Sequence, residues 1–239
     1  MHPWPSSSEE HKLRERIQQV SAVLGARLLE ESVEHSYSSG KELFDQGDAI
    51  TDVMFVCCGL VKLSYRDADG REAAVSLHTA GGILGSEGAV TGQHHVLCGQ
   101  TVTPCVIRRI PASVFRKRVS EDHQLGATLA DLHALKLIEQ VNARIVLSTL
   151  TARQRVLLML RGLSDSADAS GHQSESVKLK LPVRLTDLAQ LAEITPETLS
   201  RILRELEQHG LLERGRGWLR VQLCTHGAAS WQIRAATTD

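Results

Sequence analysis

Four polar side chains lie at helical spacing near residue 200, and their types suit contacts with the edges of DNA bases. They are Glu197, Ser200, Arg201 and Arg204, which fall on one side of a helix because they are three or four residues apart. An Arg can donate two hydrogen bonds to guanine, and a carboxylate can accept one from the amino group of cytosine. The pattern therefore predicts a helix that contacts bases, and the alternative is a helix whose charged face is only solvated.

The same segment carries signals for where this helix, 195–209, begins and ends. Thr195 is a typical cap, Pro196 suits the first helical position, and Gly210 suits the residue after the end. A shorter helix over 186–193, capped by Thr186, precedes it, so the pair predicts a helix-turn-helix. Thr198 and the free N–H groups of the first turn suit phosphate. The predicted DNA-contacting residues are Thr186, Thr195, Pro196, Glu197, Thr198, Ser200, Arg201 and Arg204.

A long helix is predicted over 121–150, and it is apolar on two sides rather than one. Two stripes are expected when a helix contacts its own domain on one side and a second subunit on the other. A fully internal helix is the alternative. The first stripe consists of Ala134, Ile138, Val141 and Ile145. The second stripe, predicted to form the dimer interface, consists of Leu129, His133, Leu137, Gln140, Arg144 and Leu147.

The segments before and after this helix differ in their patterns of apolar and turn-forming residues. Short apolar runs separated by turn residues, with Asp69-Gly70 the strongest hairpin signal, predict an antiparallel β-domain before it. Thr151 and Gln154 have capping-box spacing, so Leu150 and Thr151 form a predicted hinge between two helices. Residues 9–31 are predicted to form one or two helices, with Ser21 as the candidate cap between them. The predicted division is 1–32 for an N-terminal helical segment, 33–120 for a β-roll sensor, 121–150 for the dimerisation helix, 151–224 for a winged helix-turn-helix domain and 225–239 for a tail.

Composition narrows the class of protein. Residues 1–150 hold 15 Lys and Arg against 18 Asp and Glu, whereas 151–239 hold 12 against 10, which favours the second half for an anionic partner. No apolar run reaches the roughly 20 residues of a membrane span, and the N-terminus lacks a signal-peptide pattern, so a cytoplasmic protein is expected. No arrangement typical of a catalytic site stands out, so no enzyme is expected. The five cysteines, which show no C-x-x-C spacing, are Cys57, Cys58, Cys98, Cys105 and Cys224.

The order of these segments resembles the Crp/Fnr superfamily of bacterial transcription regulators. The stretches that carry the resemblance are GKELFDQGD, GLVKLSYRDADGRE and LTDLAQLAEITPETLSRILRELEQHGLL. It implies an α+β fold in which a cyclic-nucleotide-binding-like β-roll is followed by a dimerisation helix and a winged helix-turn-helix. The order Glu197, Ser200, Arg201 is similar to the Fnr-like branch and implies TTGA-type palindromic half-sites. The Crp branch has an Arg before the Glu and a Gly in place of the Ser, where this chain has Pro196 and Ser200.

The resemblance says less about the effector. Cyclic-nucleotide binders of the family hold the ribose with a Gly-Glu pair and the phosphate with an Arg-Ser or Arg-Thr pair. Here Gly85 is followed by Ser86, with Glu87 one position late, and His94 and His95 fall near the Arg-Ser position. A neutral imidazole is a poor substitute for a fixed cation, which argues against cyclic AMP. The predicted effector pocket is formed by Leu84, Gly85, Glu87, His94, His95, Gln140 and Val141.

Cofactor options are judged from the same residues. An Fnr-type iron–sulfur cluster needs closely spaced cysteines near the N-terminus, and the first 56 residues contain none. Haem and a small organic molecule are both compatible with the sequence as the effector. At least one of the adjacent Cys57 and Cys58 is expected to be buried. The candidate axial ligands for haem are His94, His95, Cys98 and His133.

Two other functions compete with a regulator. A cupin-like metal protein would need an H-x-H motif, whereas His94 and His95 are adjacent and point to opposite faces of a strand. A cyclic-nucleotide-binding-like regulatory module without a DNA role would not need the helix-turn-helix segment. The expected partners are therefore double-stranded DNA, a second copy of the chain in a homodimer, RNA polymerase and a small effector, with no membrane.

Overall fold

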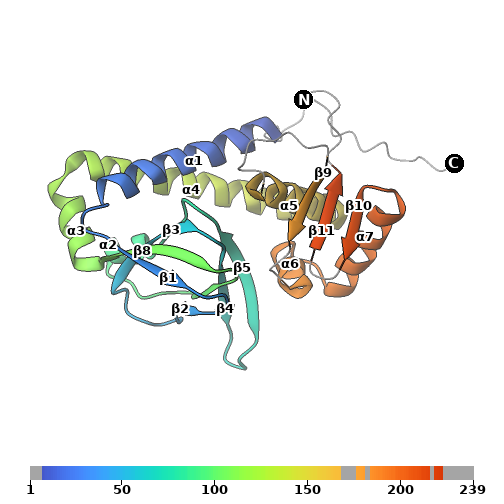
Figure 1. Cartoon of the computed structure of the whole chain (residues 1–239), viewed down its shortest axis with the longest axis horizontal. Coiled ribbons are helices and arrows are strands. Elements are labelled where there is room, and N and C mark those ends of the chain that lie inside the picture. The colour runs from blue at the N-terminus through green and yellow to red at the C-terminus, as the bar shows by residue number, and fades with distance from the viewer. Residues whose placement is uncertain (1–6, 168–175, 181–183, 216–217, 223–239) are drawn as a thin grey trace.

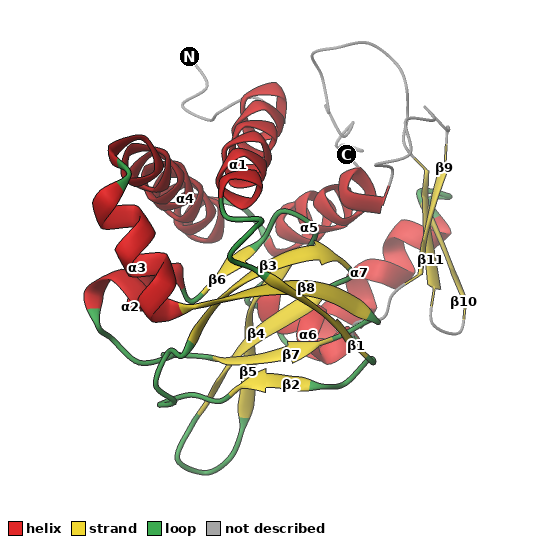
Figure 2. Ribbon diagram, turned by 60° about the vertical axis from the view of Figure 1, so that its left-hand side comes forward, coloured by secondary structure: helices red, strands yellow, loops and turns green. Residues whose placement is uncertain are grey.

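The computed structural model of the chain describes residues 7–167, 176–180, 184–215 and 218–222 (Figure 1). An antiparallel β-roll occupies one end and a small unit of helices and strands the other. The long helices α1 (Ser7–Arg27) and α4 (His123–Thr149) lie along one side of the roll (Figure 2). The predicted tail 225–239 lies outside the described residues.

Two antiparallel sheets form the β-roll, as the sequence predicts. One sheet has the strand order β1-β8-β3-β6, and its members are β1 (Val33–Tyr37), β8 (Cys105–Pro111), β3 (Asp52–Cys58) and β6 (Ile83–Leu84). The other has the order β2-β7-β4-β5, and its members are β2 (Glu42–Phe44), β7 (Cys98–Thr101), β4 (Val61–Arg66) and β5 (Glu72–His78). Strand β5 is therefore an edge strand.

The predicted hairpin at Asp69-Gly70 joins β4 to β5. The side chain of Asp67 accepts hydrogen bonds from the backbone N–H groups of Asp69 and Arg71. Gly70 has φ of 78°, a left-handed conformation that a side chain disfavours. The Asp and Gly residues at this position therefore suit the tight turn that the chain makes between β4 and β5.

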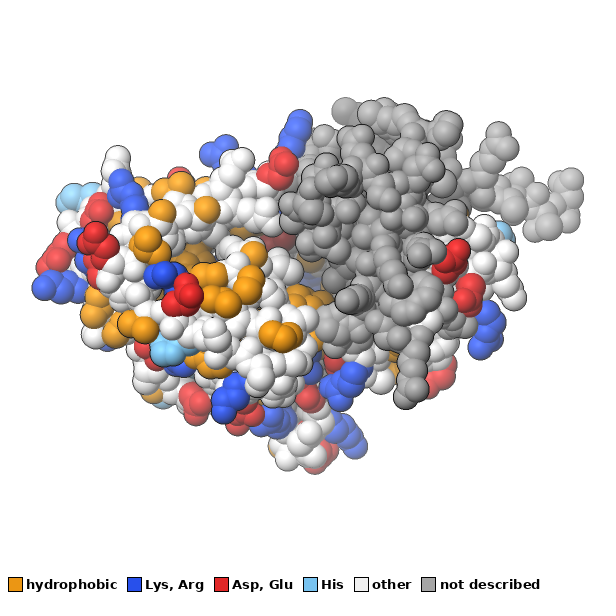
Figure 3. All heavy atoms as spheres, viewed as in Figure 1, with side chains coloured by type: hydrophobic (Ala, Val, Ile, Leu, Met, Phe, Trp, Pro, Cys, Tyr) orange, Lys and Arg blue, Asp and Glu red, His pale blue; other side chains and the backbone are white. Residues whose placement is uncertain are grey.

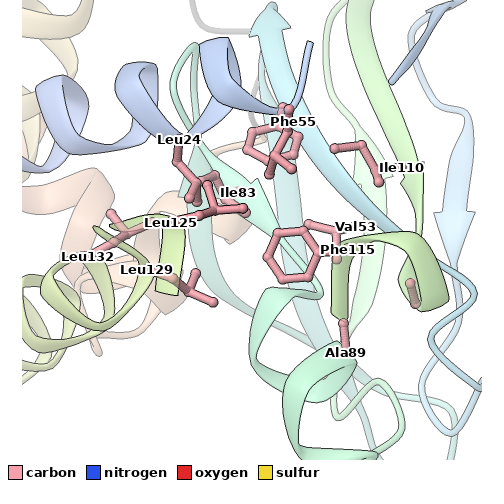
Figure 4. Packing of buried hydrophobic residues seen from close by; sticks show 12 residues of the cluster. Leu24, Val53, Phe55, Ile83, Ala89, Ile110, Phe115, Leu125, Leu129 and Leu132 are labelled. Atoms are coloured by element: carbon pink, nitrogen blue, oxygen red, sulfur yellow. The ribbon is translucent and has the colours of Figure 1, made fainter. Parts of the chain in front are cut away.

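A hydrophobic core joins the β-roll to its helices (Figure 4). Phe115 of α3 (Ala112–Glu121) lies between the roll and α4, and it is fully buried. Leu24 of α1 and Leu125 of α4 belong to the same cluster, as does Ala89 of α2 (Ser86–Thr91). Burial of such side chains is the main favourable contribution to the stability of this half.

Two helix boundaries differ from the prediction. The N-terminal segment forms one helix, and Ser21 is 3% exposed in its interior rather than a cap between two helices. Helix α4 begins at His123 because Asp122 has extended backbone and its side chain accepts hydrogen bonds from the N–H groups of Gln124 and Leu125. The residues before Asp122 form the separate helix α3, most of which lies in the range 33–120 predicted for the β-roll.

A break separates α4 from α5 (Ala152–Ala167), as predicted. Leu150 has extended backbone, and Thr151 and Gln154 exchange the two hydrogen bonds of a capping box. The C-terminal unit then consists of β9 (Ser176–Lys180), α6 (Leu185–Leu191), α7 (Pro196–Gln208), β10 (Leu212–Gly215) and β11 (Trp218–Gln222). Its three strands form an antiparallel sheet in the order β10-β11-β9. Among the described residues, no helix is long and apolar enough to cross a membrane.

Candidate nucleic-acid interface and effector region

Helix α7 has one buried face and one polar face. Its buried side chains are Leu199, Ile202, Leu203 and Leu206, each at most 4% exposed. The side chain of Thr195 accepts a hydrogen bond from the N–H of Thr198 at 3.2 Å, and Pro196 occupies the first turn. Gly210, with φ of 69°, follows the end. The predicted caps and helix limits are confirmed.

The polar face of α7 surrounds a shallow hollow of about 400 Å³. The residues that line the hollow, called the recognition face below, are Pro196, Glu197, Ser200, Arg201 and Arg204. Glu197, Arg201 and Arg204 are exposed, and Ser200 is half-buried. The predicted polar residues are thus brought together on one accessible surface, with two guanidinium groups and a carboxylate around a concave centre.

The helix before α7 begins differently from the prediction. Arg184 is the N-cap of α6, and Thr186 is an exposed residue of its first turn, so Thr186 does not cap this helix. Asp187 of the same turn is buried and receives two hydrogen bonds from Arg184 at 3.1 and 3.2 Å. In the turn that joins the helices, Glu193 has φ of 50°, an uncommon conformation for a residue with a side chain.

The predicted wing forms after α7. Strands β10 and β11 pair antiparallel, with Leu212 opposite Val221 and Gly215 opposite Trp218. The tip of this hairpin, residues 216–217, lies outside the described residues. The hairpin follows α7 directly, so helix pair and wing form one unit.

The exposed apolar face of α4 differs from the predicted dimer stripe. Leu129 is 4% exposed in the core against the β-roll, so its assignment to the dimer interface is wrong. His133 and Leu147 are half-buried within their own chain, whereas Leu137, Gln140 and Arg144 are exposed. Figure 3 shows hydrophobic side chains scattered among charged ones on one face of the molecule. The large apolar residues that α4 exposes are Leu137, Ile138, Val141 and Ile145, between 40% and 60% exposed.

A polar cluster lies where α2 meets α4, close to part of the predicted effector pocket. Ser86 shares a hydrogen bond of 3.1 Å with Nε2 of His133. Nζ of Lys136 lies 3.6 Å from Glu87 and donates to the carbonyl of Ile83 at 3.1 Å. Gly85, with φ of 80°, starts α2 beside this cluster. The sequence reading missed Lys136, because only the fold shows which residue of α4 faces α2.

The ionisable groups of this cluster respond to burial and to one another. Burial opposes the charge of Glu87, but Lys136 and neighbouring donors outweigh it and hold the pKa of Glu87 below its usual range. Burial lowers the pKa of His133 despite the nearby Glu87. Nearby His78, whose pKa burial and Lys136 lower to about 4, stays neutral at pH 7. The cluster therefore presents one cation and one carboxylate beside neutral imidazoles.

The other predicted effector residues lie in different surroundings. Leu84 is buried among apolar side chains, and His95 is 9% exposed and stacks on Phe44 with ring centres 3.8 Å apart. Gln140 and Val141 are exposed on α4. The predicted pocket is therefore not a single cavity lined by all seven residues.

The haem candidates and the cysteines are similarly dispersed. The thiol of Cys98 is buried and donates to a carboxylate oxygen of Asp45 at 2.8 Å, while His94 is exposed. Cys57 and Cys58 are both exposed, contrary to the expectation that one is buried. The pairing of β3 with β8 shifts register between Val56 and Cys58, and this irregularity ends the alternation on which the expectation rested.

Two family models match the chain. A cyclic nucleotide-binding domain matches residues 34–122, and a Crp-like helix-turn-helix domain matches residues 154–224. These ranges contain the β-roll and the helix-turn-helix with its wing.

Known proteins resemble the chain over most of its length. The nitrogen fixation regulation protein FixK of Azorhizobium caulinodans is 28% identical over 221 residues, which are 88% of this chain and 84% of FixK. The cAMP-activated global transcriptional regulator CRP of Salmonella typhimurium is 25% identical over 74% of this chain and 84% of CRP. The structure of FixK2 from Bradyrhizobium japonicum has the same fold, with a TM-score of 0.67, 24% identity and coverage of 80% of this chain and 92% of FixK2.

Proposed function

Because the chain belongs to the Crp/Fnr superfamily of effector-controlled, DNA-binding transcription regulators, we propose that it acts as a homodimer on palindromic TTGA-type half-sites. The observation that carries this proposal is the recognition face of α7. Its Glu197, Ser200 and Arg201 match the order that resembles the Fnr-like branch, and all three line one hollow. The proposed division of labour is the one expected from the sequence, with the β-roll as sensor and the C-terminal unit as DNA-binding domain.

The chemistry of the recognition face suits base pairs in a major groove. The guanidinium of Arg201 can donate two hydrogen bonds to O6 and N7 of a guanine, and Glu197 can accept from a cytosine amino group. Thr195, Thr198 and Thr186, all near helix N-termini, suit phosphate contacts. The recognition face is already accessible, so DNA can reach these groups without a change of the fold.

The exposed stripe on α4 supports the homodimer. Leu137, Ile138, Val141 and Ile145 repeat at helical spacing and are 40% to 60% exposed. A second α4 packed against them would bury this apolar surface, as in a two-stranded coiled coil. The palindrome then follows from the two-fold symmetry of the dimer, since each α7 would occupy one of two half-sites about 34 Å apart.

The effector is proposed to act where α2 meets α4. Lys136, His133 and Glu87 link the β-roll to α4, and α4 continues to the break at Leu150 and Thr151. A small molecule that binds one arrangement of this junction more tightly than another shifts the population of DNA-binding dimers. Haem is one form such an effector could take. The protein is proposed to act in the cytoplasm without enzymatic activity. RNA polymerase is proposed as a further partner.

A direct test is binding of the full chain to a fluorescent duplex that carries two TTGA half-sites in a palindrome. We expect saturable binding that weakens at least tenfold when either half-site is scrambled. Insertion of five base pairs between the half-sites should also weaken binding, because it turns them to opposite sides of the duplex. Equal affinity for all these duplexes would contradict the proposed half-site.

The dimer and the effector have their own measurements. Sedimentation of the wild type should give a dimer, and Val141→Glu, which places a charge in the exposed stripe, should give a monomer. A dimeric Val141→Glu variant would refute the proposed interface. An absorption spectrum of protein from iron-supplied cells, recorded with and without dithionite, would identify haem by a Soret band that shifts on reduction.

A further inference from the structure

The first helix of the helix-turn-helix lies against the edge strand of the β-roll. Gln190 of α6 accepts a hydrogen bond from the N–H of Ala74 at 2.8 Å and donates one to the carbonyl of Glu72 at 3.0 Å. Its side-chain amide thus occupies the place that a neighbouring strand would take beside β5. An edge strand leaves such groups unpaired unless something covers them. Here the covering group comes from a residue 116 positions away in the sequence.

Buried charges from both units meet beside this contact. Nζ of Lys62, on β4, lies 2.8 Å from Glu72 and 3.8 Å from Asp187 of α6. The side chains of Lys62 and Asp187 are only 4% and 8% exposed. Arg184 pairs with Asp187 at 3.1 Å and lies 3.9 Å from Glu72. Removing one of these charges while the units stay docked would leave another buried charge short of a partner, which is strongly unfavourable.

Apolar side chains complete the interface. Leu60 of the β-roll belongs to the same hydrophobic cluster as Leu188 of α6 and Leu203 of α7. Leu77 and Val102, also from the roll, pack against that cluster while partly buried. The β-roll and the helix-turn-helix therefore share one core.

The docked arrangement leaves the recognition face free. Among the described residues, those that line the hollow all belong to α7, whereas the hydrogen bonds to β5 come from α6 (Figure 2). The chain enters the C-terminal unit through Leu150, whose extended backbone separates α4 from α5. Docking of α6 on β5 adds a contact between the two units beyond the chain connection at Leu150, and this contact helps to define the orientation of α7. Such preorganisation reduces the entropy lost when α7 enters a groove.

We propose that Gln190 and the Lys62–Asp187 pair are positioning residues for DNA binding, and that the docked arrangement is the one that binds DNA. This inference rests on the proposed DNA-binding function. These residues need not contact DNA: they fix α6 on β5, and α6 in turn fixes α7. Loss of the contact should therefore weaken DNA binding without any change to the recognition face.

The docking itself is tested by hydrogen exchange of the full chain. The amide of Ala74 should be protected in the free protein and at least as well protected in the DNA complex. Gln190→Ala should remove that protection while amides that pair β4 with β5 keep theirs. Faster exchange of Ala74 when wild-type protein binds DNA would overturn the inference, since docking would then oppose binding.

The effect on function is tested with a duplex that the wild-type chain enriches from a random pool. We expect Gln190→Ala to bind it about fivefold more weakly, which is the scale of a typical hydrogen bond. Lys62→Met, which leaves Asp187 paired with Arg184, gives an independent variant of the same interface. Gln19→Ala, an exposed glutamine on α1, is the matched control and should bind as the wild type does.

The outcomes separate the two proposals. Unchanged or tighter binding by folded Gln190→Ala and Lys62→Met would overturn the positioning role, while the DNA-binding function would stand. A wild-type chain that enriches no duplex would refute the proposed function and the positioning role together. Thermal unfolding of each variant shows whether weaker binding merely reflects a smaller folded fraction.

Discussion

The recognition face of α7 and the polar cluster between α2 and α4 are organised in opposite ways. All five residues of the recognition face come from one segment of nine residues, 196–204, on one helix. The polar cluster instead joins Ser86 to His133, which are 47 positions apart, and Lys136 to Ile83, which are 53 apart. One surface is therefore defined by helical geometry alone, and the other exists only once the β-roll and α4 have packed.

This difference decides how each region responds to change. An exposed side chain on α7 can be replaced with little effect on the fold, so its effect on DNA binding can be measured separately. A residue between α2 and α4 contributes to packing and to the cluster together. We therefore expect stability and function to separate in the DNA-binding unit and to change together in the sensor half.

The largest expected effect is on the sensor core. Phe115→Ala removes a fully buried ring between the β-roll and α4 and should lower the free energy of unfolding by about 3–5 kcal/mol. Urea unfolding followed by circular dichroism measures this change. Arg116→Ala, at the exposed neighbouring position, should change it by less than about 0.5 kcal/mol. A loss below about 1 kcal/mol for Phe115→Ala would contradict the packing described.

The next effect is on DNA affinity and should leave stability unchanged. Arg201→Ala should weaken binding to the palindrome by about 1–3 kcal/mol per half-site and reduce discrimination at the contacted base. The dimer should persist, because Arg201 is an exposed residue of α7 and the proposed dimer contact is on α4. Fluorescence anisotropy with wild-type and single-base-changed duplexes measures both quantities. Arg71→Ala, an arginine 80% exposed on the β4–β5 hairpin, serves as the control for loss of charge.

Burial of a histidine in the sensor half should make the stability of the protein depend on pH. The pKa of His78 is lowered from 6.5 to about 4, so the folded state keeps this imidazole neutral where the unfolded chain binds a proton. The stabilisation is complete above pH 6.5 and is lost as pH falls toward 4, with an amplitude of about 3 kcal/mol. Unfolding measured between pH 7 and 4 should show a shallower decline for His78→Gln than for wild type. Identical slopes would mean that His78 has the same pKa in the folded and in the unfolded protein.

The smallest expected effect returns to the DNA-binding unit. Thr195→Ala removes the side chain that accepts from the N–H of Thr198 and should lower stability by about 1 kcal/mol. Calorimetry of the full chain measures it, with Thr128→Ala on α4, where the hydroxyl does not cap a helix, as comparison. If both variants melted alike, the cap would not contribute to the stability of α7.

Rules of local backbone geometry were sufficient to predict features whose interactions join residues close in sequence. The sequence by itself determined the caps Thr195 and Gly210, the capping box of Thr151 and Gln154, the hairpin at Asp69-Gly70 and the polar face of α7. Each of these depends on backbone geometry within a few residues, and that geometry is the same in any fold. The order of the segments also followed from the residues, and that order carried the resemblance to a known family.

Only the tertiary structure decided which face of α4 is buried, and the reason is physical. Both stripes of α4 are apolar, so periodicity could not tell that Leu129 faces the β-roll while Ile138 and Val141 are exposed. Periodicity likewise could not show that Gln190 pairs with β5 or that Lys62 is buried beside Asp187. The spacing of polar residues along one helix or strand does not indicate which distant residue they will contact. Those contacts form when whole helices and strands pack together, and the spacing of residues along one element does not predict that packing.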